Sequence, residues 1–178
     1  MNQYQRIKRI FLGITILFVV ASKADAQAQY EISQDTKHPE IKVLRGIINK
    51  YLIQNDTAFT KWYTYNQGIY SPDTATLNVF EHTKGKLHFI LFGGTWCEDT
   101  QFVLPRFFKL QEMSGISDDM ISFFGVNREK RTLGNFAAAF GITNVPTIIV
   151  MKEGKEIGRV VEYGKTGRFD KELADIMK

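Results

Sequence analysis

The second half of the chain alternates between two hydrophobic patterns, that of a buried strand and that of an amphipathic helix. Residues 87–92 form a nearly continuous apolar run, which is typical of a central strand buried on both faces. Residues 97–112 instead place apolar side chains three and four positions apart, which predicts a helix with one buried face. A second apolar run at residues 121–126 predicts another strand.

The same alternation continues to the C-terminus and predicts the fold class. The expected elements are a short helix over residues 133–140 that ends at Gly141, strands over residues 147–151 and 156–162 joined by a turn at 152–155, and an amphipathic helix over residues 169–177. The order β-α-β-α-β-β-α predicts an α/β fold. A helix between two strands implies a parallel pair, and the final hairpin adds an antiparallel edge. The sheet is therefore expected to be mixed, with helices on both faces.

Residues 27–85 are expected to form a helical N-terminal extension packed on this core. Its aromatic residues allow two interpretations: they cover a face of the sheet, or they wall a groove beside the cysteine discussed below. We favour packing, because aromatic stripes usually pack. The predicted helices begin at Pro39, with Ile41, Leu44, Ile48, Tyr51 and Leu52 on one face; after Asp56 as a cap, with Phe59, Trp62 and Tyr63; and at Ser71-Pro72-Asp73, with Leu77 and Phe80.

The first 26 residues have the pattern of a secretory signal peptide. Arg6, Lys8 and Arg9 form a basic start, residues 10–21 are uncharged and mostly apolar, and Ala24-Asp25-Ala26 offers small residues for cleavage. The apolar run is shorter than the roughly 20 residues of a membrane span, and no later segment approaches that length. We therefore expect a mature protein secreted across the inner membrane, most readily to the periplasm. An uncleaved anchor is the alternative.

Removing that leader changes the interpretation of the charge. The whole chain has a net charge of +4, but the leader carries four of the 23 Lys and Arg and one of the 19 Asp and Glu. The remainder, about 152 residues and one domain's worth, has a net charge of +1. No run of basic residues suggests nucleic-acid binding, since the nearest, residues 128–131, is short and interrupted.

Cys97 is the only cysteine of the 178 residues, so a secreted chain would contain no internal disulfide. A thiol of this kind is either buried and inert or exposed and reactive. His38, His82 and His88 show no metal-ligand spacing with each other or with Cys97, so no metal site and no cofactor is expected.

The motifs around Cys97 resemble those of the thioredoxin-like superfamily. Trp96-Cys97-Glu98-Asp99-Thr100 is similar to the W-C-x-x-C active site, and Pro105 falls where thioredoxins carry the proline of the active-site helix. Residues 140–147, with Val145 and Pro146, resemble the segment F-G-V-x-x-x-P-T, whose proline is cis and faces the sulfur; Gly154 and Gly164 match two further family glycines. The resemblance covers residues 86–178. A closer likeness is to secreted thioredoxin-like proteins of Bacteroidetes with a W-C-E-D-T-Q site.

The sequence departs from the family at two positions that serve the same half-reaction. Thr100 replaces the second cysteine, which in thioredoxins resolves the mixed disulfide, and a hydroxyl cannot form an S–S bond. Leu91 occupies the position of a buried acid that helps to move protons at the resolving thiol. The residues for the first attack, by a thiolate at a helix N-terminus, are retained. We expect Thr100 to stabilise this thiolate by donating a hydrogen bond to the sulfur, and the negative charges of Glu98 and Asp99 to destabilise it.

Two hypotheses about function follow. The first is monothiol exchange, in which Cys97 forms mixed disulfides with protein thiols or disulfides, or with a low-molecular-weight thiol, while Val145 and Pro146 hold the partner in an extended pose. The second is a non-catalytic binding or chaperone-like domain that retains the groove without turnover. Exposure of the Cys97 sulfur favours the first, and its burial favours the second.

Overall fold

The computed structural model describes residues 29–178, so the predicted leader at residues 1–26 lies outside the described residues. The strands are β1 (Tyr30–Gln34), β2 (Lys42–Ile48), β3 (His88–Gly93), β4 (Ile121–Gly125), β5 (Thr147–Lys152) and β6 (Lys155–Val161). The helices are α2 (Lys50–Gln54), α3 (Thr60–Gly68), α4 (Thr74–Thr83), α5 (Glu98–Ser114), the 3-10 turn η1 (Asp118–Met120), α6 (Phe136–Ala139) and α7 (Phe169–Met177).

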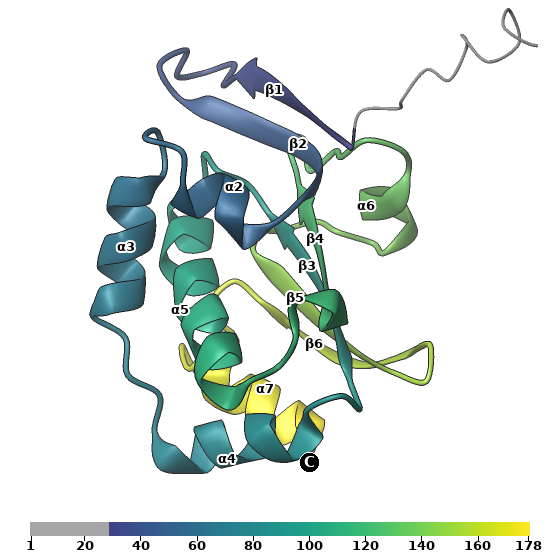
Figure 1. Ribbon diagram of the computed structural model, residues 1–178. Coiled ribbons are helices and arrows are strands. Elements are labelled where there is room, and N and C mark those ends of the chain that lie inside the picture. The colour runs from purple at the N-terminus through teal and green to yellow at the C-terminus, as the bar shows by residue number, and fades with distance from the viewer. Residues whose placement is uncertain (1–28) are drawn as a thin grey trace, which may run out of the picture.

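These strands form one mixed sheet in the order β1-β2-β4-β3-β5-β6 (Figure 1). Only β3 and β4 run parallel, with α5 as the connection between them, and the other neighbouring pairs are antiparallel. The terminal hairpin turns through Glu153 and Gly154, both with positive φ, as a two-residue hairpin requires. The predicted mixed sheet and the predicted order of elements after residue 86 are confirmed.

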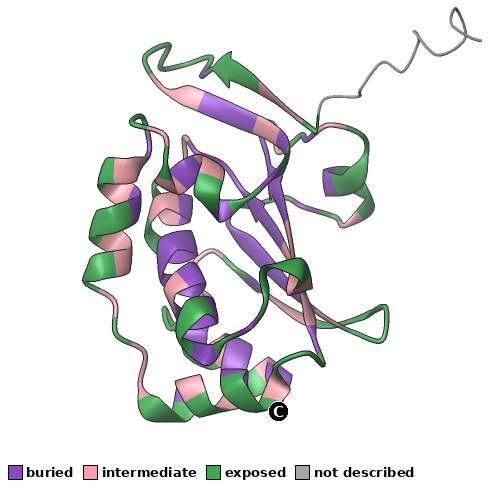
Figure 2. Ribbon diagram, viewed as in Figure 1, coloured by how far each residue is buried: buried purple, intermediate pink, exposed green. Residues whose placement is uncertain are grey.

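Helices cover both faces of the sheet, and β3 shows how its side chains are divided between them. Phe89 and Leu91 belong to the larger hydrophobic cluster, with the helices α3, α4, α5 and α7. Phe92 belongs to the smaller cluster on the other face, where α6 packs, and Ile90 packs against that cluster. The buried colour therefore follows the middle of the sheet and the inner sides of the helices (Figure 2).

The predicted helix beginning at Pro39 is wrong, because residues 42–48 form strand β2. This strand pairs on one side with β1 and on the other with β4, where Gly46 lies opposite Gly125 and Ile48 opposite Phe123. Leu44 and Ile48 are four residues apart, a spacing that places two side chains on one face of a helix and equally on one face of a strand. The edge of β4 supplies the hydrogen bonds that decide between the two.

The other helices of the extension largely follow the prediction. Asp73 caps α4, since its side chain accepts a hydrogen bond from Thr76 N. Asp56 instead stabilises the turn before α3: its carboxylate accepts the Ala58 N–H, while the helix begins after Phe59 without a side-chain cap. Phe59 and Tyr63 are buried in the core, as the packing interpretation predicted.

Candidate functional site

Cys97 stands at the N-cap of α5, directly after the turn that follows β3. Its backbone N–H donates to Gly94 O at 2.9 Å, and its carbonyl accepts the Gln101 N–H at 3.0 Å. The side chain is half-buried, and Sγ donates a hydrogen bond to Val145 O at 3.3 Å. The Val145–Pro146 peptide bond is cis. The structure therefore brings together the two segments that the motifs singled out, although 48 residues separate them.

The surroundings of the sulfur contain charges of both signs. Glu98 and Asp99 lie in the first turn of α5, where they complement the helix dipole. Burial, together with a hydrogen bond to Asp99 and the nearby Cys97, raises the pKa of Tyr163 to about 12, so this phenol stays neutral beside the site. The positive charges lie near Trp96: the guanidinium carbon of Arg128 and Nζ of Lys130 are 4.8 and 5.7 Å from the centroid of its ring.

Thr100 has a different role from the one expected. It is 1% exposed, and its Oγ1 accepts the Gly94 N–H at 3.2 Å. Among the described residues, no hydrogen bond joins it to Cys97 Sγ, so the expectation that it donates to the sulfur is not met. The hydroxyl points back to the strand exit because Gly94 presents a buried N–H that needs an acceptor. Thr100 therefore fixes the turn that carries Cys97, and it is too deeply buried to contact a substrate.

Two further positions follow the sequence interpretation. Pro105 lies inside α5 and is buried, and its missing N–H leaves the carbonyl one turn earlier without its helical donor. In the same stretch, Nη1 of Arg106 donates to Phe102 O at 2.9 Å. Leu91, at the position of the missing acid, is fully buried between strands β4 and β5.

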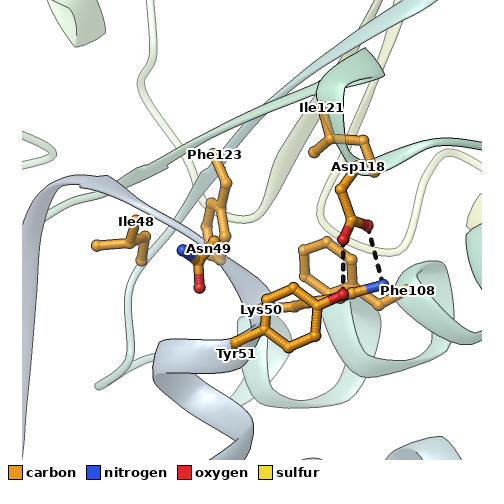
Figure 3. Close-up of a pocket in the computed structure, with 8 residues that line it drawn as sticks. All are labelled: Ile48, Asn49, Lys50, Tyr51, Phe108, Asp118, Ile121 and Phe123. Carbon is orange, nitrogen blue, oxygen red and sulfur yellow. Dashed lines mark hydrogen bonds and ion pairs between the residues drawn. The ribbon is translucent and has the colours of Figure 1, made fainter.

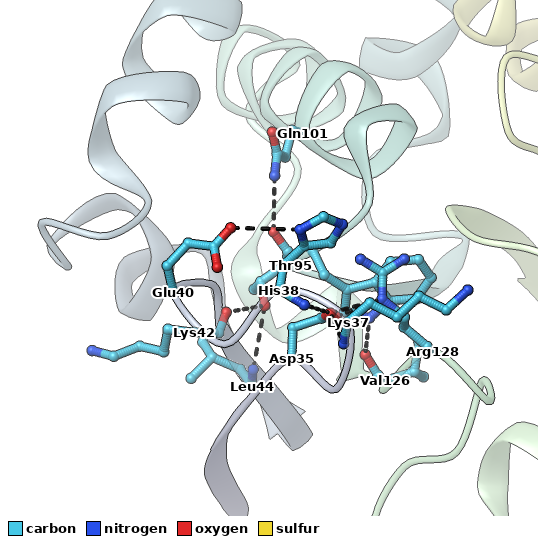
Figure 4. A network of polar contacts seen from close by, with 11 residues as sticks. Asp35, Lys37, His38, Glu40, Lys42, Leu44, Thr95, Gln101, Val126 and Arg128 are labelled. Atoms are coloured by element: carbon cyan, nitrogen blue, oxygen red, sulfur yellow. Dashed lines mark hydrogen bonds and ion pairs between the residues drawn. The ribbon is translucent and has the colours of Figure 1, made fainter.

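Trp96 is held by contacts that the sequence analysis missed. Its Nε1 donates to Val126 O at 2.9 Å, and Arg128 stacks over its ring. Arg128 Nε in turn bonds both oxygens of Asp35, at 2.9 and 2.7 Å (Figure 4). Asp35 is buried and comes from the loop between β1 and β2. The extension therefore reaches the residue next to the cysteine through a chain of three side chains.

A second connection joins the same turn to β2. Thr95 Oγ1 accepts the Leu44 N–H at 3.3 Å and donates to Lys42 O at 2.9 Å (Figure 4). From the helix side, Gln101 Nε2 donates to Thr95 O at 2.9 Å. No sequence signal predicts these pairs, because they join residues 51 and 53 positions apart and depend on β2 being a strand.

The pKa of Asp35 reflects this connection. Burial acts to raise it, but the hydrogen bonds from Arg128 and from the backbone N–H groups of Lys37 and His38 outweigh burial and lower the pKa. The carboxylate is therefore charged at neutral pH and is an acceptor for four hydrogen bonds.

A cavity of about 150 Å³ lies at the other end of α5, with both apolar and polar side chains in its lining (Figure 3). Lys50 Nζ is 2.9 Å from Glu112 Oε1 and 3.0 Å from Asp118 Oδ1. Burial acts to lower the pKa of Lys50, but these two carboxylates raise it overall. Tyr51 donates to the second oxygen of Asp118 at 2.7 Å. This cluster fastens α2 to the C-terminal end of α5, far from Cys97 at its start.

Within residues 29–178 no three His, Cys, Asp or Glu side chains gather as a metal site would require. None of the helices in the same part of the chain combines the length and the apolar character of a membrane span.

The fold and the position of Cys97 define a protein of the thioredoxin-like class. The Thioredoxin family model matches residues 74–176, more than half of the chain, and the chain belongs to the thioredoxin family. The match begins at α4, twelve residues before the expected start of the core.

Individual relatives agree with this assignment. The chain is 34% identical over 76 residues to Thioredoxin H2-2 of Oryza sativa subsp. japonica, which covers 43% of this chain and 52% of the rice protein. It is 24% identical over 86 residues to Thioredoxin of Staphylococcus saprophyticus, covering 48% of this chain and 78% of that protein. The chain thus spans about half the length of the rice relative.

A crystal structure of an HIV epitope scaffold is similar over 66% of this chain and 79% of that one, with 17% identity and a TM-score of 0.44.

Proposed function

We propose that this protein performs the first half of thiol–disulfide exchange through Cys97 alone. The Cys97 thiolate attacks one sulfur of a partner disulfide, a new S–S bond forms to Cys97, and the second sulfur leaves as a thiolate. The observation that carries the proposal is the placement of Cys97: it is half-buried at the N-cap of α5, and its Sγ lies 3.3 Å from the carbonyl oxygen of Val145 beside the cis-proline. A helix N-terminus favours the thiolate that this attack needs.

Release of the partner then depends on a thiol from outside the protein. Cys97 is the only cysteine, and the third position after it holds a buried hydroxyl that faces Gly94. An external protein thiol or a low-molecular-weight thiol attacks the mixed disulfide and regenerates the Cys97 thiolate. Electrons balance because the incoming thiol becomes half of the released disulfide.

The partner is proposed to bind as an extended chain along the proline loop. The carbonyl of Val145, which precedes the cis bond to Pro146, accepts the hydrogen bond from Sγ, so a backbone placed beside this loop would bring its own sulfur to Cys97. Trp96, Glu98 and Asp99 flank the approach. Because Glu98 is exposed and acidic, the proposed partner is neutral or basic around its cysteine.

The proposed location is outside the cytoplasm, most readily the periplasm. The basic start, the apolar run and the Ala-Asp-Ala site within residues 1–26 support it. The likeness to secreted Bacteroidetes proteins with a W-C-E-D-T-Q site points the same way.

The test restores the missing thiol. Wild type should not turn over in a dithiol-driven protein-disulfide reduction assay, whereas Thr100→Cys should gain activity. The gain should be partial, since Leu91 supplies no proton acceptor, and the new thiol also loses the hydroxyl that accepts the Gly94 N–H. Initial rates are measured against enzyme concentration, with Thr100→Ser as the matched control that keeps a hydroxyl.

Two outcomes would contradict the proposal. Equal rates for wild type and Thr100→Cys would show that resolution never required a second cysteine. A folded Thr100→Cys that is no more active than Cys97→Ala/Thr100→Cys would show that the site has lost redox chemistry, leaving a non-catalytic binding or chaperone-like domain.

A further inference from the structure

A second pocket is lined by Arg45 of β2 and by residues of the segment that runs from the end of β4 into α6. Figure 1 shows where β2, β4 and α6 lie. It has a volume of about 320 Å³. Arg45 contributes from β2, and Lys130, Arg131 and Thr132 contribute from the loop after β4, with Glu129 as the one acidic side chain of the lining. Ala137, Ala138 and Ile142 make the apolar part. The lining therefore combines cationic and apolar side chains.

Two buried donors of this lining have no hydrogen-bond partner in the described residues. Thr132 is 6% exposed, and its buried Oγ1 makes no hydrogen bond within the described residues. Arg45 pairs with Glu31 through Nη2 at 2.6 Å, but its buried Nε is also without a partner. A buried polar group left unpaired costs about 1–3 kcal/mol. Two such donors come from separate elements and line one pocket. A ligand with acceptor oxygens would satisfy both of them.

We propose that this pocket binds the phosphate group of a small organic molecule. The lining carries three cations against Glu129, so it attracts an anion even with Glu31 beside Arg45. Its donors are one hydroxyl, two guanidinium groups and one ammonium, carried by β2 and by the loop after β4, which suits the several oxygens of a tetrahedral oxyanion. The pocket is larger than phosphate alone, and the organic part would pack on Ala137, Ala138 and Ile142.

Binding of a ligand in this pocket can be followed through the fluorescence of Trp96. Nζ of Lys130, which lines it, lies 5.7 Å from the ring of Trp96. An anion that draws this ammonium toward Thr132 changes the electrostatic environment of the indole. Fluorescence of a Trp62→Phe variant, in which Trp96 is the remaining tryptophan, therefore reports binding. The proposal is independent of the redox chemistry, so Cys97→Ser serves as the working background.

The experiment titrates this variant with inorganic phosphate and with phenyl phosphate at constant ionic strength, with chloride as the reference anion. We expect saturable binding of both, tighter for phenyl phosphate because its ring packs on the apolar residues of the lining. Thr132→Val should weaken binding by about tenfold, and Arg45→Lys, which keeps the charge but removes Nε–H, by a similar factor. Lys155→Gln on the remote hairpin should leave binding unchanged.

The Thr132→Val variant separates ligand binding from a structural role. Because its hydroxyl has no partner in the free protein, removing it should leave the free energy of unfolding unchanged or raise it. Unchanged or higher stability with weaker phosphate binding supports the site. Absence of a saturable signal, or equal affinities for wild type, Thr132→Val and Lys155→Gln, would overturn it.

Discussion

At the scale of single residues, the site depends on how closely the turn after β3 is packed. Gly94 accepts the Cys97 N–H, donates to Thr100 and lies against the indole of Trp96. A methyl group on Gly94 would approach the Trp96 ring to 2.6 Å, and the indole is tied in place by Val126 O. The absence of a side chain at Gly94 therefore lets the turn close at the start of α5 and leaves room for the indole of Trp96.

Gly94→Ala should destabilise the protein by about 1–3 kcal/mol, because the indole must shift against its neighbours. It should also change Trp96 fluorescence in the folded state. Chemical denaturation followed by circular dichroism measures the first effect, and emission spectra in a Trp62→Phe background measure the second. Gly68→Ala is the control, since no atom lies within 4 Å of the added methyl. Equal stability of Gly94→Ala and wild type would show that the contact is not tight.

At the scale of elements, strands β1 and β2 form a hairpin that lies outside the segment matched by the thioredoxin family. Asp35 holds Arg128 against Trp96, and Thr95 is bonded to β2 on the other side of the same turn. The thioredoxin match begins at residue 74, so both contacts come from outside the matched segment. The hairpin therefore buttresses the turn that carries Cys97.

Asp35→Asn should lower the free energy of unfolding at neutral pH by about 1.5–3 kcal/mol, the range for a buried hydrogen bond to a charged group. The folded-state pKa of Asp35 is lowered, so its contribution is full above the unfolded pKa of about 3.9 and is lost as pH falls through the folded value. The difference between variant and wild type should thus shrink at acidic pH. Denaturant unfolding at pH 7 and near pH 3 measures it.

The control is Glu40→Gln, whose side chain is 72% exposed and should change stability very little. A destabilisation by Asp35→Asn that is the same at both pH values would show that shape, not charge, matters at this position.

The elements also show how far sequence reasoning reached. After residue 86 the local pattern predicted every strand and α-helix in its order, because buried runs and helical spacing identify them, although α6 covers only Phe136–Ala139 of the predicted 133–140 and the 3-10 turn η1 was not predicted. In the extension, the prediction of a helix from Pro39 was wrong. The spacing of Leu44 and Ile48 fits both a helix and a strand, and the strand forms because β2 pairs with the distant β4. The candidate site was found through Cys97 and Pro146, while Asp35 and Arg128 carried no signal, since their pairing spans 93 residues. The role of Thr100 was misjudged because burial at a helix start depends on the strand behind it.

At the scale of the whole molecule, extension and core share one hydrophobic interior. Leu44, Phe59 and Tyr63 of the extension belong to the same buried cluster as Phe107 and Phe108 of α5. Tyr63 lies 6.5 Å from Phe108 between ring centroids, and β2 is hydrogen-bonded to β4. The two parts should therefore unfold together.

This can be measured because each part carries one tryptophan, Trp62 in α3 and Trp96 beside Cys97. In Trp62→Phe and Trp96→Phe variants, the remaining tryptophan should report the same denaturation midpoint as circular dichroism of the same variant. Separate midpoints for the Trp62 signal and the circular dichroism signal would show that the extension is an independent unit.

The central claim is that Cys97 completes the first exchange step and that nothing within the protein completes the second. The most direct measurement mixes the reduced, folded protein with one equivalent of a symmetrical peptide disulfide near neutral pH, and follows intact mass over time. We expect one peptide added to Cys97 with one equivalent of free peptide thiol released. The adduct should persist until an external thiol is supplied, and Cys97→Ser should form none. An adduct that forms only in denaturant, or one that disappears without added thiol, would contradict the account.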